Sequence, residues 1–284
     1  MEYKIIKTKK RTIYAPDKEL KKMQRDVLKI IKQVFKLSFS IKDCAKVHTN
    51  QKWILKMDIK NFYESVSDAQ IKRAIDSIFN NINKPVQYNK NEIYAICTLD
   101  GKLPTGAVTS AYFANMVLEP IDEIIKNYCK NLRINYSRYI DDMFFSGSDK
   151  NNLRLAEIFT AKLLYENGFS INPNKTKYIS DNRRQNILGI VVNNKTVRLP
   201  KKEKRKFRAI FYNYLKSIAL QQNGNVIPFK KIEYDVINGY ISYIRSVDTE
   251  FYKSIRKYIL YITYSMRVKD TSETKRLIKS MYWH

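Results

Sequence analysis

The chain has 284 residues, 44% of them hydrophobic, which is enough to bury a large core as one extended domain or as two to three subdomains. Its 53 Lys and Arg exceed its 27 Asp and Glu by a formal charge of +26, and so large a positive field favours a polyanion, first of all nucleic acid, over a membrane surface. Three widely spaced cysteines argue against a disulfide framework, and with only two histidines a structural zinc site is not expected. The start of the chain lacks the apolar stretch of a signal peptide. We therefore expect a cytoplasmic protein with reduced thiols.

Short strands and amphipathic helices alternate along the first part of the chain. Apolar spacing, turn residues and capping residues set the expected boundaries. We expect a strand or hairpin over residues 1–14, a helix from 16 to about 35, a strand over 52–58, helices over about 67–79 and 91–98, and a long apolar helix over about 109–129 in which Pro120 predicts a kink.

The next part is rich in strand patterns and gives way to basic helices. We expect a hairpin over 133–146, a helix over about 151–166, and short strands over 176–180, 185–193 and 196–199. Helices are expected over 201–220, 230–246, 249–266 and 271–281. The change to basic helices predicts a domain boundary near residue 200.

Two adjacent acidic residues, Asp141 and Asp142, interrupt the hydrophobic hairpin where it turns. Their repulsion opposes folding, and a bound cation would reverse that cost. Asp58 ends another strand-like run and supplies a third acid. Converging carboxylates are what Mg²⁺ needs when it clamps a phosphoryl transfer, and the structural alternative is that these acids are turn or cap residues.

At these residues the sequence resembles reverse transcriptases. Five ordered segments between about residues 8 and 200 carry the resemblance: Arg11-Thr12-Ile13 with Pro16, Leu20 and Gln24; Met57 to Val66 around Asp58; Leu103 to Ser110, similar to Leu-Pro-Gln-Gly-Ala; the Tyr-x-Asp-Asp box Tyr139-Ile140-Asp141-Asp142; and Gly168 to Thr176, similar to Gly-Leu-x-Ile-Asn-x-x-Lys-Thr. The resemblance implies an α+β right-hand polymerase fold. Residues 1–200 would form the fingers and a palm with a small antiparallel sheet plus helices, and 201–284 a helical thumb that binds RNA or duplex.

The resemblance also implies which residues carry RNA-directed DNA synthesis. Asp58, Asp141 and Asp142 are expected to be catalytic and, with the backbone carbonyl of Ile59, to hold two Mg²⁺ ions. Lys175 is expected to approach the pyrophosphate leaving group and to neutralise charge or donate a proton there, with a solvated surface lysine as the alternative.

Four further residues are expected to contact the incoming nucleotide. Arg11 matches the fingers arginine that binds the triphosphate. Tyr63 stands where the family places a ring that excludes a ribose 2′-OH, although a core aromatic is the alternative. Thr105 replaces the usual Gln of its motif, and Gly106 would permit close backbone approach to the nucleotide.

Within the family the sequence resembles the retron type. Ala45 to His48 is similar to the retron Asn-Ala-x-x-His element, with Cys44 in place of Asn, and Ile187 to Val191 keeps only the glycine of Val-Thr-Gly. His48 is expected to support the fold or contact RNA. The first basic helix after Pro200 should track a duplex backbone with its charged face, which includes Lys201, Lys202, Arg205 and Arg208.

The expected function is that of a retron reverse transcriptase. It would copy a cognate structured non-coding RNA, with dNTPs, into multicopy single-stranded DNA, and would act in bacterial antiphage defence with an effector protein. Two alternatives stay open: another defence-associated reverse transcriptase with protein-primed or untemplated synthesis, and a non-catalytic RNA-binding protein with a polymerase fold.

Overall fold

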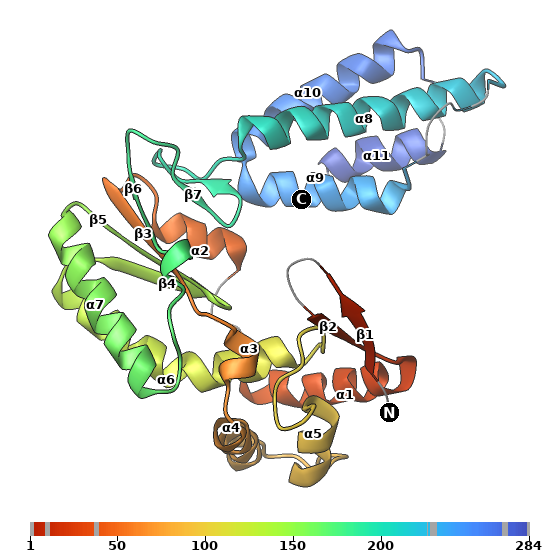
Figure 1. The fold of residues 1–284 in the computed structure, drawn as a ribbon. Coiled ribbons are helices and arrows are strands. Elements are labelled where there is room, and N and C mark those ends of the chain that lie inside the picture. Colours follow the sequence, from red (N-terminus) through yellow and green to blue (C-terminus); the bar gives the residue numbers. More distant parts are fainter. Residues whose placement is uncertain are drawn as a thin grey trace. The chain divides into compact units, whose positions relative to one another are not determined.

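The protein is described by a computed structural model over residues 3–8, 12–36, 40–225, 227, 232–268 and 272–282. The chain folds into two compact units, Met1–Arg183 and Arg184–His284, which Figure 1 shows as a ribbon. Within the described residues, helices that combine the length and the apolar character needed to span a bilayer are absent.

A four-stranded antiparallel sheet forms the centre of the first unit, in the order β4-β5-β3-β6. The strands are β3 (Trp53–Asp58), β4 (Asn135–Tyr139), β5 (Asp142–Gly147) and β6 (Lys177–Ser180). Along β5, Met143 and Phe145 join the main hydrophobic core, whereas Phe144 and Ser146 are buried on the other face. Because side chains alternate along a strand, β5 is covered on both faces, which explains its continuous apolar run.

Helices cover both faces of this sheet. Helices α6 (Ser110–Asn131) and α7 (Lys150–Glu166) pack against β4, β5 and β3, and α2 (Ile41–Val47) packs against β4 (Figure 1). Pro120 lies inside α6, which continues across it, so the kink stays a prediction.

The remaining elements of the first unit pack against α6 or against one another. It consists of the antiparallel hairpin of β1 (Tyr3–Lys7) and β2 (Thr12–Pro16), the helices α1 (Lys18–Val34), α3 (Phe62–Ser65), α4 (Asp68–Asn81) and α5 (Lys90–Cys97), and the short 3-10 turn Pro173–Lys175. The Ser67 hydroxyl caps α4 and the Gln70 side chain returns the contact, as the sequence pattern predicts. Helices α2 and α3 were not expected, because so few turns give no readable apolar period.

The second unit contains the hairpin of β7 (Asn186–Ile187) and β8 (Ile190–Val191), followed by the helices α8 (Lys201–Gln222), α9 (Tyr234–Val247), α10 (Thr249–Ser265) and α11 (Ser272–Tyr282). The strand expected over 185–193 is split, because Leu188 and Gly189 take positive φ values of 50° and 88° and turn the chain. The strand expected over 196–199 is wrong: Arg198 forms only an isolated bridge with Val191.

The compact units divide before the boundary that the change in composition predicts near residue 200. The segment after Arg184 belongs with the helices, because the Leu199 N–H donates to the Asp248 carboxylate at 2.9 Å and Ile187, Ile190 and Leu199 are buried. The assignment of 1–200 to fingers and palm and of 201–284 to the thumb stays a prediction.

Asp248 ties this segment to the helices, and its removal should destabilise the protein. The carboxylate is 2% exposed and accepts the N–H groups of Leu199 and Phe251 and the Lys204 ammonium. Asp248→Ala leaves these donors buried without an acceptor, so we expect the free energy of unfolding to fall by about 3 kcal/mol in urea titrations. The control Glu250→Ala removes an exposed ion pair with Lys253 and should change it by less than about 0.5 kcal/mol. Equal losses for both variants would contradict this role.

Candidate active site

The pairing of β3 with β5 places two of the predicted acids opposite each other. Asp58 is the last residue of β3, Asp142 is the first residue of β5, and the two are partners in the antiparallel register. The Ile59 N–H then donates to the Asp141 carbonyl at 3.0 Å. Strand register therefore brings Asp58, Asp141 and Asp142 to the same end of the sheet, although 83 positions separate Asp58 from Asp141 (141 − 58).

A tight turn carries the acidic pair. Tyr139 pairs with Asp142, so Ile140 and Asp141 alone connect β4 to β5. Ile140 has a φ of 58°, a left-handed conformation that costs a β-branched residue roughly 1–2 kcal/mol and that glycine usually takes in such turns. Contacts elsewhere must therefore hold this turn in place.

Two lysines compensate the charge of the acids. The Asp58 carboxylate is 4% exposed and accepts the Lys175 ammonium at 2.8 Å. Asp142 accepts the Lys56 ammonium at 2.7 Å. Lys56 lies on β3 and Lys175 on the turn before β6, so the sheet and its adjoining turn position both ammonium groups.

The third acid keeps a raised affinity for protons. Burial raises the pKa of the Asp141 carboxyl above its usual value, and the charges of Asp142 and Asp58 raise it further, while a backbone hydrogen bond and the charge of Lys175 oppose the shift. The hydrogen bond to Asp58 in turn raises the pKa of the Lys175 ammonium. Three carboxylates therefore share this end of the sheet with two lysines, and part of their repulsion stays uncompensated.

The predicted metal site is incomplete in this arrangement. Among the residues that the structure describes, no three His, Cys, Asp or Glu side chains converge closely enough to hold an ion. Two of the three carboxylates are instead paired with the ammonium groups of Lys175 and Lys56. The donor set still fits a hard cation, since carboxylate oxygens under mutual repulsion gain most from one. Ile59, 1% exposed, follows directly, and a role for its carbonyl stays a prediction.

Tyr63 lies on α3, five positions after Asp58 in the sequence. Its half-buried ring stacks on Phe62, with ring centroids 5.6 Å apart, and Phe62 packs in turn against buried Phe169. Asn61 precedes the helix with a φ of 49° and turns the chain out of the strand into α3. The ring of Tyr63 is partly exposed, and its contact with a nucleotide stays a prediction.

Thr105 and Gly106 pack against the β1–β2 hairpin. The Tyr14 N–H donates to the Thr105 carbonyl at 2.7 Å, and a Cβ on Gly106 would lie 2.7 Å from the Tyr14 carbonyl oxygen. The φ of Gly106 is +119°. The structure places the backbone of β2 close to Gly106, and the expected approach of Gly106 to a nucleotide stays a prediction. Arg11 lies outside the described residues.

His48 does not reach the surface, so direct contact with RNA was a wrong expectation. The ring is fully buried, and its two nitrogens lie 2.7 Å from the Ser146 hydroxyl and 2.9 Å from the Ser137 hydroxyl. These serines lie on β5 and β4, on the face that α2 covers. His48 therefore supports the fold by fastening both strands of the acidic hairpin to the end of α2.

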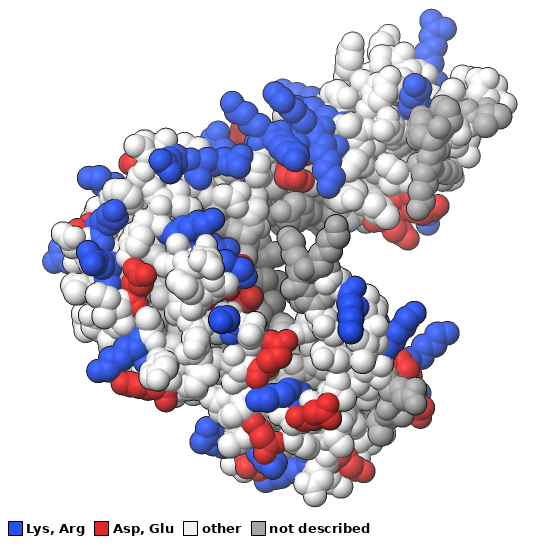
Figure 2. All heavy atoms as spheres, viewed as in Figure 1, with Lys and Arg blue, Asp and Glu red and all other residues white. Residues whose placement is uncertain are grey.

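The basic residues predicted on α8 have different environments. Lys201, Lys202 and Arg205 are exposed, whereas the half-buried Arg208 guanidinium lies 5.2 Å from the centre of the Phe251 ring. Figure 2 shows Lys and Arg side chains gathered over the first turns of α8. The three exposed side chains can meet a phosphate backbone, while Arg208 also has a packing role.

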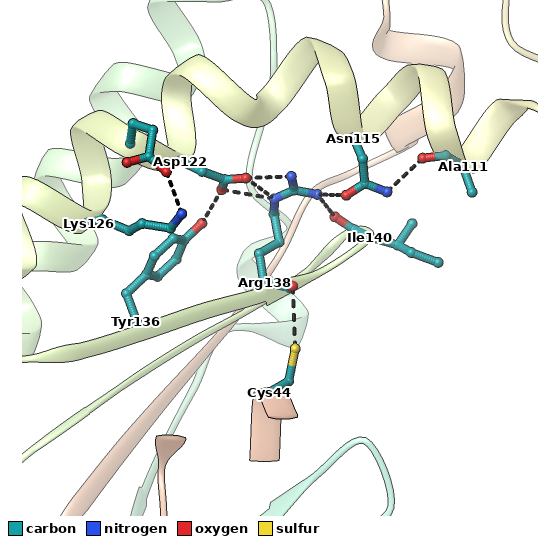
Figure 3. Close-up of polar contacts among 9 residues, drawn as sticks. Cys44, Ala111, Asn115, Asp122, Lys126, Tyr136, Arg138 and Ile140 are labelled. Carbon is teal, nitrogen blue, oxygen red and sulfur yellow. Dashed lines mark hydrogen bonds and ion pairs between the residues drawn. The ribbon is translucent and has the colours of Figure 1, made fainter. Parts of the chain in front are cut away.

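A buried polar cluster beside the acidic hairpin was missed by the sequence analysis. Arg138, the residue before the Tyr-x-Asp-Asp box, binds Asp122 and Asn115 on α6 and the Ile140 carbonyl (Figure 3). The available signals were an arginine inside a hydrophobic strand and an aspartate within an apolar helix. Nothing in their spacing indicates that they meet.

Comparisons with known proteins agree with this geometry. The family model described as "Reverse transcriptase (RNA-dependent DNA polymerase)" matches residues 4–192. The chain is 26% identical over 281 residues to the retron Ec83 reverse transcriptase of Escherichia coli, covering 90% of this chain and 86% of the relative, and 27% identical over 263 residues to the retron Ec86 reverse transcriptase of Escherichia coli, covering 89% and 76%. Among solved structures, telomerase from Candida albicans in complex with a fragment of telomeric RNA aligns with a TM-score of 0.55 at 12% identity, over 100% of this chain and 66% of that one.

The chain belongs to the reverse transcriptase family and has the right-hand polymerase fold. Within that family it is of the retron type, as the curated relatives indicate, and its activity is RNA-directed DNA synthesis. These findings confirm the resemblance, the α+β fold class and the enzyme class predicted from the sequence.

The buried His48 ring makes the stability of the protein depend on pH. Burial lowers the pKa of His48 to about 3, so between about pH 3 and pH 6.5 the unfolded chain binds a proton that the folded chain does not. Stability is therefore lost as the pH falls, by about 2 kcal/mol between pH 6.5 and pH 5. In urea titrations His48→Gln should be less stable at pH 7 and should lack this part of the slope. An unchanged slope in His48→Gln would show that the ring is not held neutral.

Proposed function

We propose that this reverse transcriptase copies a structured non-coding RNA into multicopy single-stranded DNA in the bacterial cytoplasm, as part of an antiphage defence system with an effector protein. The observation that carries the polymerase chemistry is the placement of Asp58, Asp141 and Asp142 at one end of the β3–β5 pair. The retron-type relatives support the kind of template and product.

The acids are proposed to hold two Mg²⁺ ions, through the carboxylates of Asp58 and Asp141 and the carbonyl of Ile59, with Asp142 in support. When bound, the ions lower the pKa of the primer hydroxyl and stabilise the charge of the triphosphate. The fit rests on crowding: burial raises the pKa of Asp141, and the two neighbouring carboxylates raise it further. Lys56 and Lys175 keep the acids from repelling the chain apart before cations bind.

Lys175 is proposed to act at the leaving group. The Asp58 hydrogen bond raises its pKa, so it carries a proton at neutral pH. Its side chain is 57% exposed, which leaves the ammonium able to turn from Asp58 towards a pyrophosphate. Charge neutralisation or proton donation there would stabilise the transition state of nucleotidyl transfer.

The nucleotide is proposed to lie between the acids and the first part of the chain. Tyr63 would meet the sugar, Arg11 would bind the triphosphate, and Thr105 and Gly106 would line the approach. The backbone hydrogen bond from Tyr14 to Thr105 supports this arrangement, because it fastens β2, the strand that follows Arg11 in the sequence, to the Thr105 segment.

The template RNA and its DNA product are proposed to contact α8. Lys201, Lys202 and Arg205 are exposed within three turns of that helix, and Arg208 adds charge beside them. Such a face binds phosphates without reading sequence, so recognition of a particular RNA needs further contacts.

Nucleic acid that copurifies with the protein tests the function. We expect the wild-type chain, expressed in bacteria with its neighbouring genomic sequence, to yield DNA of defined length joined to RNA by a 2′–5′ branch. Asp141→Asn combined with Asp142→Asn should yield RNA alone and lose at least about a thousandfold of DNA synthesis in vitro. The control Asp26→Asn alters a partly exposed aspartate paired with Lys29 and should be fully active.

Three results would contradict the proposal in different ways. DNA synthesis retained by the double variant would exclude the acids from catalysis. DNA with a protein at its 5′ end, or with no RNA complement, would favour protein-primed or untemplated synthesis. RNA without DNA in the wild type would favour a non-catalytic RNA-binding protein.

Selection between dNTP and rNTP tests the role of Tyr63. A smaller side chain removes the ring that would collide with a 2′-OH, so Tyr63→Val should raise rNTP incorporation relative to dNTP by about tenfold or more in competition assays. Phe62→Leu is the matched control, because Phe62 is buried beneath Tyr63 and should affect stability more than sugar choice. Unchanged discrimination in Tyr63→Val would leave Tyr63 as a packing residue.

A further inference from the structure

A buried guanidinium connects the acidic hairpin to the long helix α6 (Figure 3). The Arg138 side chain is 6% exposed. Its Nε donates to the two Asp122 carboxylate oxygens at 2.9 and 3.0 Å, and a terminal nitrogen donates to Asp122 at 2.5 Å. Asp122 thereby fixes one edge of the planar group, as a bidentate carboxylate does.

The other edge of the guanidinium faces the turn. Its second terminal nitrogen donates to the Ile140 carbonyl at 2.7 Å and to the Asn115 side-chain oxygen at 2.7 Å. The Asn115 amide donates in turn to the Ala111 carbonyl at 2.6 Å, so its orientation is set by α6. One side chain thus links the residue just before Asp141 to two positions along the helix.

Ile140 is the residue whose backbone most needs such support. Its positive φ is unfavourable for a β-branched side chain, and a relaxed turn would move both acids that follow. The carbonyl contact from Arg138 acts on that backbone directly. The contacts of His48 with Ser137 and Ser146 reach the strands but not the turn.

We infer that Arg138 is a positioning residue for DNA synthesis: it holds the Ile140 carbonyl against α6 and so keeps Asp141 and Asp142 in place for the cations and the primer. This inference rests on the proposed role of the two aspartates. Arg138 touches neither nucleotide nor primer, and it acts through the turn.

Arginine and lysine differ in the way this role requires. A lysine at 138 keeps the positive charge beside Asp122, but its single ammonium cannot span Asp122, Asn115 and the Ile140 carbonyl as a planar fork does. If the cluster only neutralises a buried charge, lysine should suffice. If the fork holds the turn, lysine should fail at the chemical step.

Arg138→Lys separates these two roles. We expect kcat for primer extension to fall by about tenfold to a hundredfold, since small misplacements of reacting groups cost that much. The KM for dNTP should stay within about twofold, because substrate contacts are untouched. The Mg²⁺ concentration that half-saturates the rise in melting temperature should increase, and this readout does not depend on turnover.

Ile140→Gly provides a rescue and Tyr136→Phe a matched control. Glycine accepts a positive φ without strain, so in the Ile140→Gly background the loss of kcat caused by Arg138→Lys should shrink by at least about threefold. Tyr136→Phe removes a 2.6 Å hydrogen bond to Asp122 from the same cluster without touching the turn. It should lower the melting temperature and leave kcat and the Mg²⁺ midpoint unchanged.

Wild-type kcat and Mg²⁺ midpoint in Arg138→Lys would overturn the inference, and so would an equal loss of kcat in Tyr136→Phe or a missing rescue by glycine. If Arg138→Lys does not fold, Asn115→Ala removes the second contact of the same nitrogen, and wild-type kcat in that variant would overturn the inference equally. A wild-type chain that makes no DNA would contradict the proposed function alone, because the Mg²⁺ midpoint still tests Arg138.

Discussion

Mutual repulsion among three carboxylates is the constraint around which the first unit of this protein is arranged. The register in which β3 and β5 pair brings Asp58, Asp141 and Asp142 to the same end of the sheet. Their charge is offset by Lys175 and Lys56, which the neighbouring turn and strand supply. The two lysines offset enough of the negative charge for the chain to fold. The repulsion that is left between the carboxylates would be relieved by bound cations.

Holding such a cluster requires rigid support from both faces of the sheet. On one face His48 fastens Ser137 and Ser146, and on the other Arg138 fastens the Ile140 carbonyl to α6. Buried polar groups of this kind contribute little net stability compared with well-packed apolar groups, so their value lies in geometry. The unfavourable φ of Ile140 agrees with such a positioning role, because local backbone strain persists only where the surrounding contacts hold it.

Sequence patterns predicted most of the regular structure. The long helices and the central strands followed from apolar period and from caps such as Ser67, because those signals are local. The short helices α2 and α3 were not predicted. The compact units divide at Arg183, before the change in composition near residue 200, and the hydrogen bond of Leu199 with Asp248 joins two positions far apart in the sequence. The amino-acid composition shows where the charge of the chain changes, but it does not show which segments pack into the same core.

The residues of the site that belong to a sequence motif could be predicted. The residues that belong to it through contacts made on folding could not. The expected strand order and the Tyr-x-Asp-Asp box predicted that Asp58 lies near Asp141 and Asp142. The ion pairs of Lys56 and Lys175, the burial of His48 and the cluster around Arg138 all depend on side chains that meet only after folding. For the same reason the contact of Gly106 with the Tyr14 carbonyl was not expected, and its approach to a nucleotide stays a prediction.

A crystal structure with a primer–template, a non-reacting dNTP and Mg²⁺ tests the central claim most directly. We expect divalent ions held by the carboxylates of Asp58 and Asp141, with the Lys175 ammonium released from Asp58. Ions bound elsewhere, with Lys175 still paired to Asp58 beside a bound nucleotide, would contradict it.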